Sequence, residues 1–301
     1  MRLKDRLRAV AQHLKGSRAV QSKHPSIIQI REQLTKIKND ALRLANERLA
    51  KKIWCYETIL SIQEDYAEAF RCLRRRNFYK AWCLYEKVEI ALLFLGQHFL
   101  ESNGEYRLEF IAAQTSKFQS LFPYALFFST AILQKEVRCS ICNARLGLRT
   151  GCGHVIGEIY AGKLCCRMIT DLDLLEISVV TEPVNKYAVG FLKDEATGKT
   201  LDQHDYKLAS YVASGLVSPF HGWEIEWTTR REPHSLFADL EAHDKCPCGG
   251  GKPYGECCLS EEGVLRRHAI VTFEFRPPAD LPALVHSAHR VRARPDATGL
   301  P

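Results

Sequence analysis

The sequence predicts an α+β protein: an N-terminal all-α helical bundle, then a small zinc-stapled α+β module and a C-terminal zinc loop. Helical periodicity dominates the first 132 residues, and nine of the twelve cysteines fall into two clusters beyond them. Short runs of β-branched and aromatic residues lie between those clusters. We therefore expect a bundle with a basic N-terminal arm over 1–132, a Cys/His zinc-binding α+β domain over 133–235, a zinc module with a following strand over 236–276, and a disordered tail over 277–301.

Apolar residues at helical spacing support the predicted bundle. One face of residues 2–15 carries Leu3, Leu7, Val10, Ala11 and Leu14. A second seam alternates spacings of three and four through Ile27, Ile30, Leu34, Ile37, Ala41 and Leu44. This seam is shorter than the three to four heptads of an independent coiled coil, so a hairpin within one chain is favoured over a dimer. The helical pattern then continues, with an interruption at Arg74-Arg75-Arg76-Asn77, to about Leu133.

The charge is concentrated at the N-terminus. Residues 1–52 contain 14 Lys and Arg against four acids, whereas the whole chain has a net charge of only +7. Such an arm, together with Arg74–Arg76, can contact phosphates or an acidic protein surface. A solvated helix face is the alternative interpretation.

Strand patterns appear only after the bundle. They cover 157–164, 176–180, 186–192 and 223–228, with a helix expected over 205–216. Thr170-Asp171 and Asp173 are expected to begin a helix, because a threonine cap followed by acids suits a first helical turn.

Four thiols lie within thirteen residues near the C-terminus: Cys246, Cys248, Cys257 and Cys258. A tetrahedral Zn²⁺ ion needs four such ligands, and the glycines between them allow a tight loop. Adjacent Cys257 and Cys258 cannot easily bridge each other, so zinc is favoured over disulfides.

This stretch resembles the SEC-C motif, the zinc module at the C-terminus of the protein-export ATPase SecA and of many other bacterial proteins. The resemblance is limited to about residues 244–260. The four cysteines match the family's metal ligands, and the framework is matched by Pro247, Gly249, Gly251, Lys252 and Tyr254. Gly250 replaces a usual serine, and Pro253, Gly255 and Glu256 replace usual lysines. The resemblance implies metal binding, a bacterial origin and a docking role.

The first cluster consists of Cys139-x2-Cys142, then Cys152-Gly153-His154, then Cys165-Cys166. A C-x2-C knuckle with a distant C-x-H is a typical zinc spacing. Cys139 and Cys142 are the expected first pair of ligands. Cys152, His154 and Cys165 compete for the other two positions, and Cys166 is expected in the core or as a spare thiol.

These features favour a non-catalytic zinc adaptor that holds two Zn²⁺ ions and recruits a protein partner through its bundle and zinc modules. RNA or DNA binding through residues 1–52 is the first alternative. A zinc hydrolase centred on His154 and Glu158 is the second, although H-E-x-x-H and the deaminase signature are both missing. We assign no catalytic residue.

The N-terminus has no apolar core that would make it a signal peptide, and the apolar run 121–133 is broken by Pro123. We expect no membrane association. Clustered thiols without a secretory signal favour a reducing cytoplasm.

Overall fold

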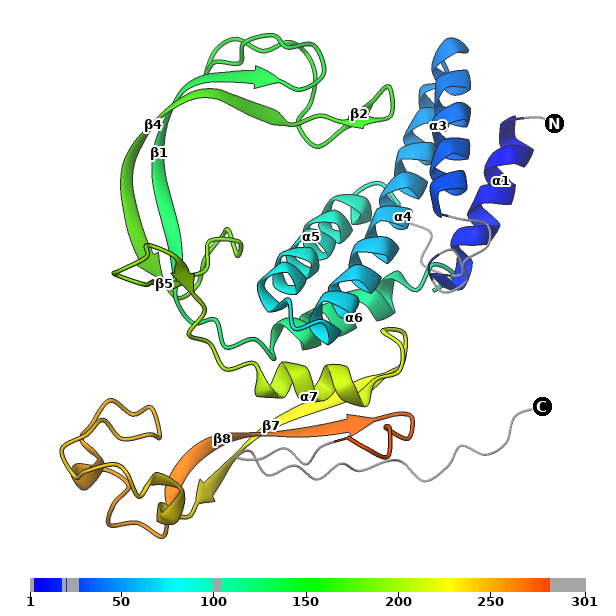
Figure 1. The fold of residues 1–301 in the computed structure, drawn as a ribbon. Coiled ribbons are helices and arrows are strands. Elements are labelled where there is room, and N and C mark those ends of the chain that lie inside the picture. The colour runs from blue at the N-terminus through cyan, green and yellow to red at the C-terminus, as the bar shows by residue number, and fades with distance from the viewer. Residues whose placement is uncertain (1–2, 18–19, 21–26, 100–103, 282–301) are drawn as a thin grey trace. The chain divides into compact units, whose positions relative to one another are not determined.

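A computed structural model describes residues 3–17, 20, 27–99 and 104–281, and Figure 1 shows its ribbon. The chain forms two compact units, one ending at Tyr206 and the other beginning at Lys207. Helices and small antiparallel sheets together give the predicted α+β class. Among the described residues, no helix combines the length and the apolar character that a bilayer span requires.

The N-terminal part of the first unit is helical, as predicted. It contains α1 (Leu3–Leu14), a short 3-10 turn η1 (Lys15–Ser17), α3 (Ile27–Arg43), α4 (Glu47–Arg74), α5 (Phe78–Gly96) and α6 (Leu108–Gln119). The last helix ends well before Leu133, where the sequence pattern placed the end of the helical region. Pro123 follows α6, and the run of aromatic and β-branched residues behind it forms a strand instead.

Most of both predicted apolar seams is buried within the bundle, but Leu44 at the end of the second seam is exposed. Leu7, Val10, Ala11 and Leu14 of α1, and Ile30, Leu34, Ile37 and Ala41 of α3, all belong to the core. A tight turn connects α3 to α4, with Ala45 at φ 49°. Asn46 caps α4, because its side-chain oxygen accepts a hydrogen bond from Leu49 N at 3.0 Å. The α3 seam therefore packs within the chain, as predicted.

A long antiparallel ribbon follows the bundle and curves so that its far end, with β2 (Ile159–Tyr160), returns toward α4 (Figure 1). Its strands are β1 (Phe127–Cys139) and β4 (Arg167–Val180), which pair from Phe127↔Val180 to Cys139↔Arg167. The helix predicted to begin at Thr170 is wrong, because this segment lies in β4. Strand pairing with β1 satisfies its backbone over the whole length, which a local cap signal cannot outweigh. The ribbon brings Cys139 close in space to the segment just before Arg167.

Smaller pieces complete the first unit. Strands β2 (Ile159–Tyr160) and β3 (Lys163–Leu164) form a hairpin inside the predicted 157–164 strand region, and β5 (Leu192–Lys193) pairs with β6 (Thr200–Leu201). Most of the predicted strand over 186–192 is irregular backbone.

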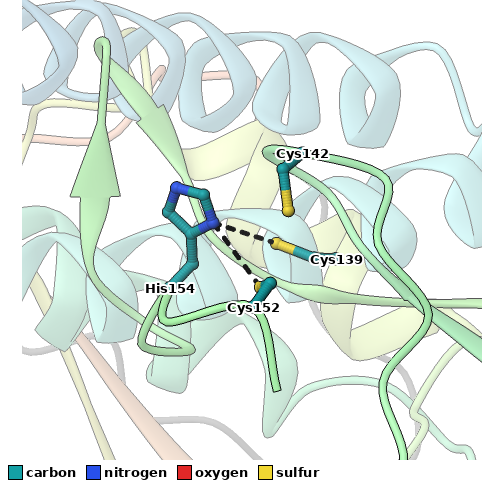
Figure 2. A group of neighbouring side chains, drawn as sticks. All are labelled: Cys139, Cys142, Cys152 and His154. Atoms are coloured by element: carbon teal, nitrogen blue, oxygen red, sulfur yellow. Dashed lines mark hydrogen bonds between the residues drawn. The ribbon is translucent and has the colours of Figure 1, made fainter. Parts of the chain in front are cut away.

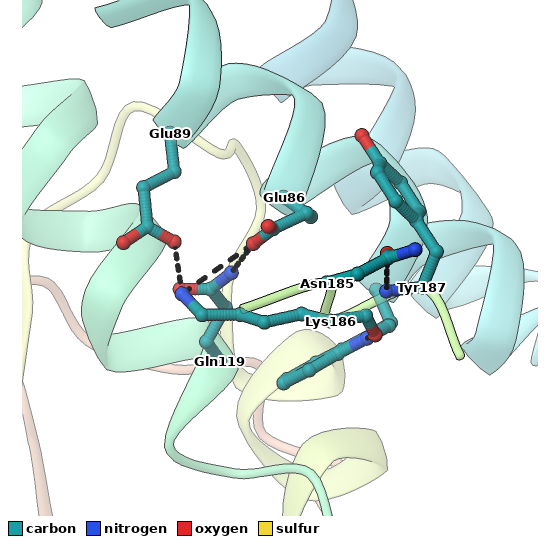
Figure 3. Close-up of polar contacts among 7 residues, drawn as sticks. Glu86, Glu89, Gln119, Asn185, Lys186 and Tyr187 are labelled. Atoms are coloured by element: carbon teal, nitrogen blue, oxygen red, sulfur yellow. Dashed lines mark hydrogen bonds and ion pairs between the residues drawn. The ribbon is translucent and has the colours of Figure 1, made fainter. Parts of the chain in front are cut away.

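Contacts with α5 fix the chain where it returns from the ribbon (Figure 3). Lys186 forms ion pairs with Glu89 and with the buried Glu86, the latter at 3.4 Å. Trp82 Nε1 donates to Lys186 O at 2.6 Å, and Tyr79 OH donates to Tyr187 O at 2.7 Å. Burial raises the pKa of Glu86, and the neighbouring Lys186 ammonium opposes that shift. The base of the ribbon is thus held by both charge and backbone contacts.

The described residues of the second unit, 207–281, form one long β-hairpin, one α-helix and two short 3-10 turns. It contains α7 (Lys207–Gly215), β7 (Trp223–Glu232), the 3-10 turns η2 (His234–Phe237) and η3 (Tyr254–Glu256), and β8 (Val264–Phe273). Strands β7 and β8 pair in continuous register from Trp223↔Phe273 to Glu232↔Val264. The C-terminal cysteine cluster therefore lies in the connection between two paired strands, which the sequence had assigned to different domains. Most of the predicted disordered tail lies outside the described residues.

Candidate metal centres

Four donors of the first cluster converge at the end of the ribbon (Figure 2). Cys139 is the last residue of β1, and Cys142 lies in the turn after it, while Cys152 and His154 come from one loop. Their ligand atoms all lie within 4.8 Å of one another. His154 Nδ1 is 3.5 Å from Cys152 Sγ and 3.8 Å from Cys139 Sγ. The structure thus brings together Cys139 and Cys142 with Cys152 and His154, two of the three predicted competitors.

The turn after β1 aims backbone N–H groups at the first thiol. Ile141 N lies 3.4 Å from Cys139 Sγ, and Cys142 N also donates to it. These bonds lower the pKa of Cys139 to about 6, because they stabilise the thiolate. Asn143, at φ 60°, closes the turn through a 2.9 Å hydrogen bond from its N–H to Cys139 O. A thiolate held by backbone donors is the usual environment of a zinc knuckle.

The second pair of ligands depends on a glycine and an aromatic ring. Gly153 has φ 82°, a left-handed conformation that allows Cys152 and His154 to face the same point. The His154 ring packs edge-on against Tyr160, with centroids 4.6 Å apart. Tyr160 OH in turn accepts a 3.0 Å hydrogen bond from Val155 N. Strand β2 therefore fixes the orientation of the imidazole.

Cys165 lies beside this group but outside the set of four. Its Sγ is 3.9 Å from Cys139 Sγ, and the residue is buried. Burial and the neighbouring Cys139 raise the pKa of Cys165 to about 11. Cys166 is exposed and donates its backbone N–H to Ser140 Oγ at 2.9 Å.

The hairpin that supports His154 is attached to the bundle. Glu47 Oε2, in the first turn of α4, accepts a 2.9 Å hydrogen bond from Ala161 N. His98 Nε2 donates to Gly157 O at 2.7 Å. No sequence signal connects His98 to a glycine 59 positions away. Pairings of this kind become visible only when the fold is known.

The C-terminal cluster brings all four predicted ligands together. The sulfur atoms of Cys246, Cys248, Cys257 and Cys258 all lie within 4.8 Å of one another. Cys248 and Cys257 are 3.5 Å apart at Sγ, and Cys257 and Cys258 are 3.9 Å apart. Four sulfurs at 2.3 Å from a tetrahedral Zn²⁺ ion would be separated by about 3.8 Å. The observed spacing therefore suits one tetrahedral ion.

Glycines shape this second loop as the sequence suggested. Gly249 and Gly251 have φ values of 82° and 78°. Gly250 N lies 3.3 Å from Cys248 Sγ, which repeats the N–H to sulfur contact of the first site. Burial raises the pKa of Cys246, but the Cys248 N–H and thiol outweigh it and lower the value to about 7. Hydrogen bonding to Cys248 raises the pKa of Cys257 to about 12.

A very small core surrounds the second site. It consists of Cys246, Tyr254, Cys258 and Val264, with Phe237 and Leu240 packed against it. His234 Nε2 donates to Glu261 O at 2.8 Å, so in the neutral ring Nδ1 accepts from Tyr254 OH at 2.5 Å. Half of the buried core residues are themselves ligands. The loop therefore has little apolar surface of its own to bury if the thiols are not held together.

Both donor sets can hold a metal ion. Each supplies four soft or borderline ligands with tetrahedral spacing, a combination that favours Zn²⁺ among the common divalent ions. The predicted hydrolase residue Glu158 is directed elsewhere: its carboxylate lies 3.5 Å from Lys51 Nζ on α4.

Comparisons of the chain with protein families, with curated proteins and with solved structures found no match. The SEC-C resemblance therefore rests on the sequence pattern alone.

Proposed function

We propose that this chain is a non-catalytic zinc protein that contains a helical bundle and two docking modules, each held together by a closed zinc site. The observation that carries the proposal is the pair of four-ligand groups with tetrahedral spacing. Four protein ligands fill the coordination sphere of a tetrahedral ion, whereas a catalytic zinc keeps one position for water or substrate. Metal binding then supplies folding free energy to modules with small cores.

The donor types support zinc as the ion. The C-terminal site offers four thiols and the first site offers three thiols and an imidazole. Thiolate-rich tetrahedral sites select zinc over the hard cations Mg²⁺ and Ca²⁺, which require oxygen ligands. The SEC-C resemblance adds a docking role for the C-terminal module, which we carry over as part of the proposal.

Metal content tests the proposal directly. Protein purified without added metal or chelator should contain two zinc ions per chain by elemental analysis. Cys248→Ser and Cys142→Ser should each reduce that value to one, because each removes one ligand from a different group. Cys83→Ser, a half-buried thiol on α5, is the matched control and should leave two ions bound. A wild-type chain without zinc, or an unchanged stoichiometry in both ligand variants, would contradict the proposal.

A second candidate function, RNA or DNA binding, is favoured by the concentration of Lys and Arg in residues 1–52. Its signature is salt dependence, because neutralising several phosphates releases counterions. Affinity for a 20-nucleotide RNA should then fall steeply between 50 and 200 mM salt, by roughly a thousandfold if about six phosphates are contacted. Affinity for a protein partner held mainly by apolar contacts would change far less over that range.

A further inference from the structure

A groove in the first unit lies between α1 and the first turns of α4. It has a volume of about 1080 Å³ and is also lined by residues just before α6. No role for it follows from the two metal sites, whose ligands are not among the residues that line it. Its size is at the upper end of pockets that enclose small molecules, which are roughly 300–1,000 Å³. A segment of polypeptide is therefore a suitable occupant.

The groove is strongly basic. Five Lys or Arg side chains and a single acid line it. That acid, Glu105, is already paired with Lys15 at 2.7 Å. In the part of the chain that the structure describes, Lys4, Arg8 and Arg48 take part in no ion pair. The lining thus carries an excess of positive charge, which favours a negatively charged ligand.

The groove also offers apolar contacts. Leu44 lines it with 67% of its surface exposed, and Leu3 of α1 and Leu49 of α4 line it as half-buried residues. An occupant with both apolar and acidic side chains matches this lining. An amphipathic helix laid in a groove presents its residues in this way, with anchors at i, i+3, i+4 and i+7.

The same residues disfavour a single strand of nucleic acid. Binding of that kind relies on aromatic rings on which the bases stack. The two tyrosines that line the groove, Tyr56 and Tyr106, are each only 4% exposed. Lys52 Nζ lies 5.7 Å from the centre of the Tyr56 ring, which covers that ring further. The groove offers cations for phosphates but no open platform for bases.

We propose that this groove binds an acidic amphipathic segment of a partner protein. The inference deepens the proposed docking function and rests on it. Arg48 and Lys52 contact the acidic side chains from α4, while Lys4 and Arg8 contact them from α1. Leu44, together with the half-buried Leu3 and Leu49, receives the apolar side chains.

The proposed occupant and the first metal site use different faces of α4. At 100° per residue, the mean direction of Glu47 and Lys51 and the mean direction of Arg48 and Lys52 are about 100° apart around the helix. Glu47 and Lys51 contact the 157–164 segment, and Arg48 and Lys52 line the groove. The metal module and a partner can therefore contact the same turns of α4 at the same time.

Selection from a random 16-residue display library on the full-length zinc-loaded chain tests the proposal without knowledge of the partner. Enriched peptides should combine Asp or Glu with Leu, Ile or Phe at helical spacing. Their dissociation constants, measured by fluorescence anisotropy, should rise at least about tenfold in Lys4→Glu/Arg8→Glu/Arg48→Glu, since opposed charges now face the ligand. The control Lys36→Glu/Arg75→Glu/Lys80→Glu changes the same charge at exposed positions outside the groove and should shift affinity less than about twofold.

A second matched pair tests the apolar contact. Leu44→Asp should weaken binding, whereas Leu93→Asp on α5, a residue that is 66% exposed, should not. The proposal is overturned if no acidic peptide is enriched, if the two triple variants bind the peptides equally, or if a 20-nucleotide RNA alone loses affinity in the groove variant. If the same sample contains two zinc ions per chain, failure of the groove proposal would leave the proposal of two zinc sites supported.

Discussion

The two metal centres obtain their ligands in different ways. All four ligands of the C-terminal site come from a thirteen-residue stretch, and its small core includes two of them. The first site takes one ligand from the end of a long strand and the others from a turn and a loop. Its supporting hairpin is also attached to α4 and to His98. Two sites with similar ligands can therefore differ in how much of the local folding free energy depends on the metal ion.

Removal of zinc should produce the largest difference between the sites. With the ions chelated, residues 237–264 should lose their hydrogen-exchange protection, because structural zinc contributes an apparent 10–16 kcal/mol or so to such modules. The 157–164 segment should keep part of its protection, since its contacts with Glu47 and His98 do not involve the metal. Mass-spectrometric hydrogen exchange on the apo and zinc-loaded chain measures both. Equal loss in the two regions would show that the bundle contacts do not support the first site.

Single ligand substitutions should repeat this contrast on a smaller scale. Cys258→Ser removes a buried ligand of the second site, and Cys152→Ser removes a half-buried ligand of the first. Each should cost one zinc ion per chain. The former should destabilise its own unit by several kcal/mol, because metal binding and folding are the same event there. Limited proteolysis, which detects local unfolding, shows which of the two variants is destabilised more. A larger destabilisation by Cys152→Ser than by Cys258→Ser would contradict the expected contrast between the two sites.

The fifth donor of the first site allows a sharper test. Cys165→Ser should leave two zinc ions bound and cost about 1–3 kcal/mol, as for a polar group placed in a buried position. His154→Ala should instead remove one ion, because Nδ1 completes the set of four. Elemental analysis and chemical denaturation of both variants decide the matter. Loss of zinc from Cys165→Ser would make Cys165 a ligand in place of one of the four.

The smallest expected effect concerns the fit of the hairpin against α4. Gly162 and Gly198 both have φ 66°, so replacing either by alanine costs about 1 kcal/mol of backbone strain. A Cβ atom on Gly162 would also come within 3.2 Å of Ala50 O, whereas one on Gly198 would meet nothing within 4 Å. Gly162→Ala should therefore be the more destabilising by about 0.5–1 kcal/mol. Equal unfolding free energies for the two variants would mean that the hairpin does not press against α4.

Chain-local signals in the sequence determined a good part of this molecule. The buried residues of the α1 and α3 seams were predicted from helical spacing, although Leu44, just beyond the end of α3, is exposed. The C-terminal cysteine group was also predictable, since its ligands and the glycines that shape the loop lie within thirteen residues. Local information failed at Thr170, where a cap-like pattern lies in a strand that is paired with residues more than 30 positions earlier.

Only the tertiary structure decided the rest. It brought Cys152 and His154 to Cys139 and Cys142 and left Cys165 outside the four, a choice among donors that have similar chemistry and differ in position. It also placed α1 beside the start of α4 and so created the basic groove. The sequence shows which metal-binding and charged residues the chain contains and how they are spaced. Which of them meet depends on long-range packing and strand pairing, whose free energies depend on residues far apart in the sequence.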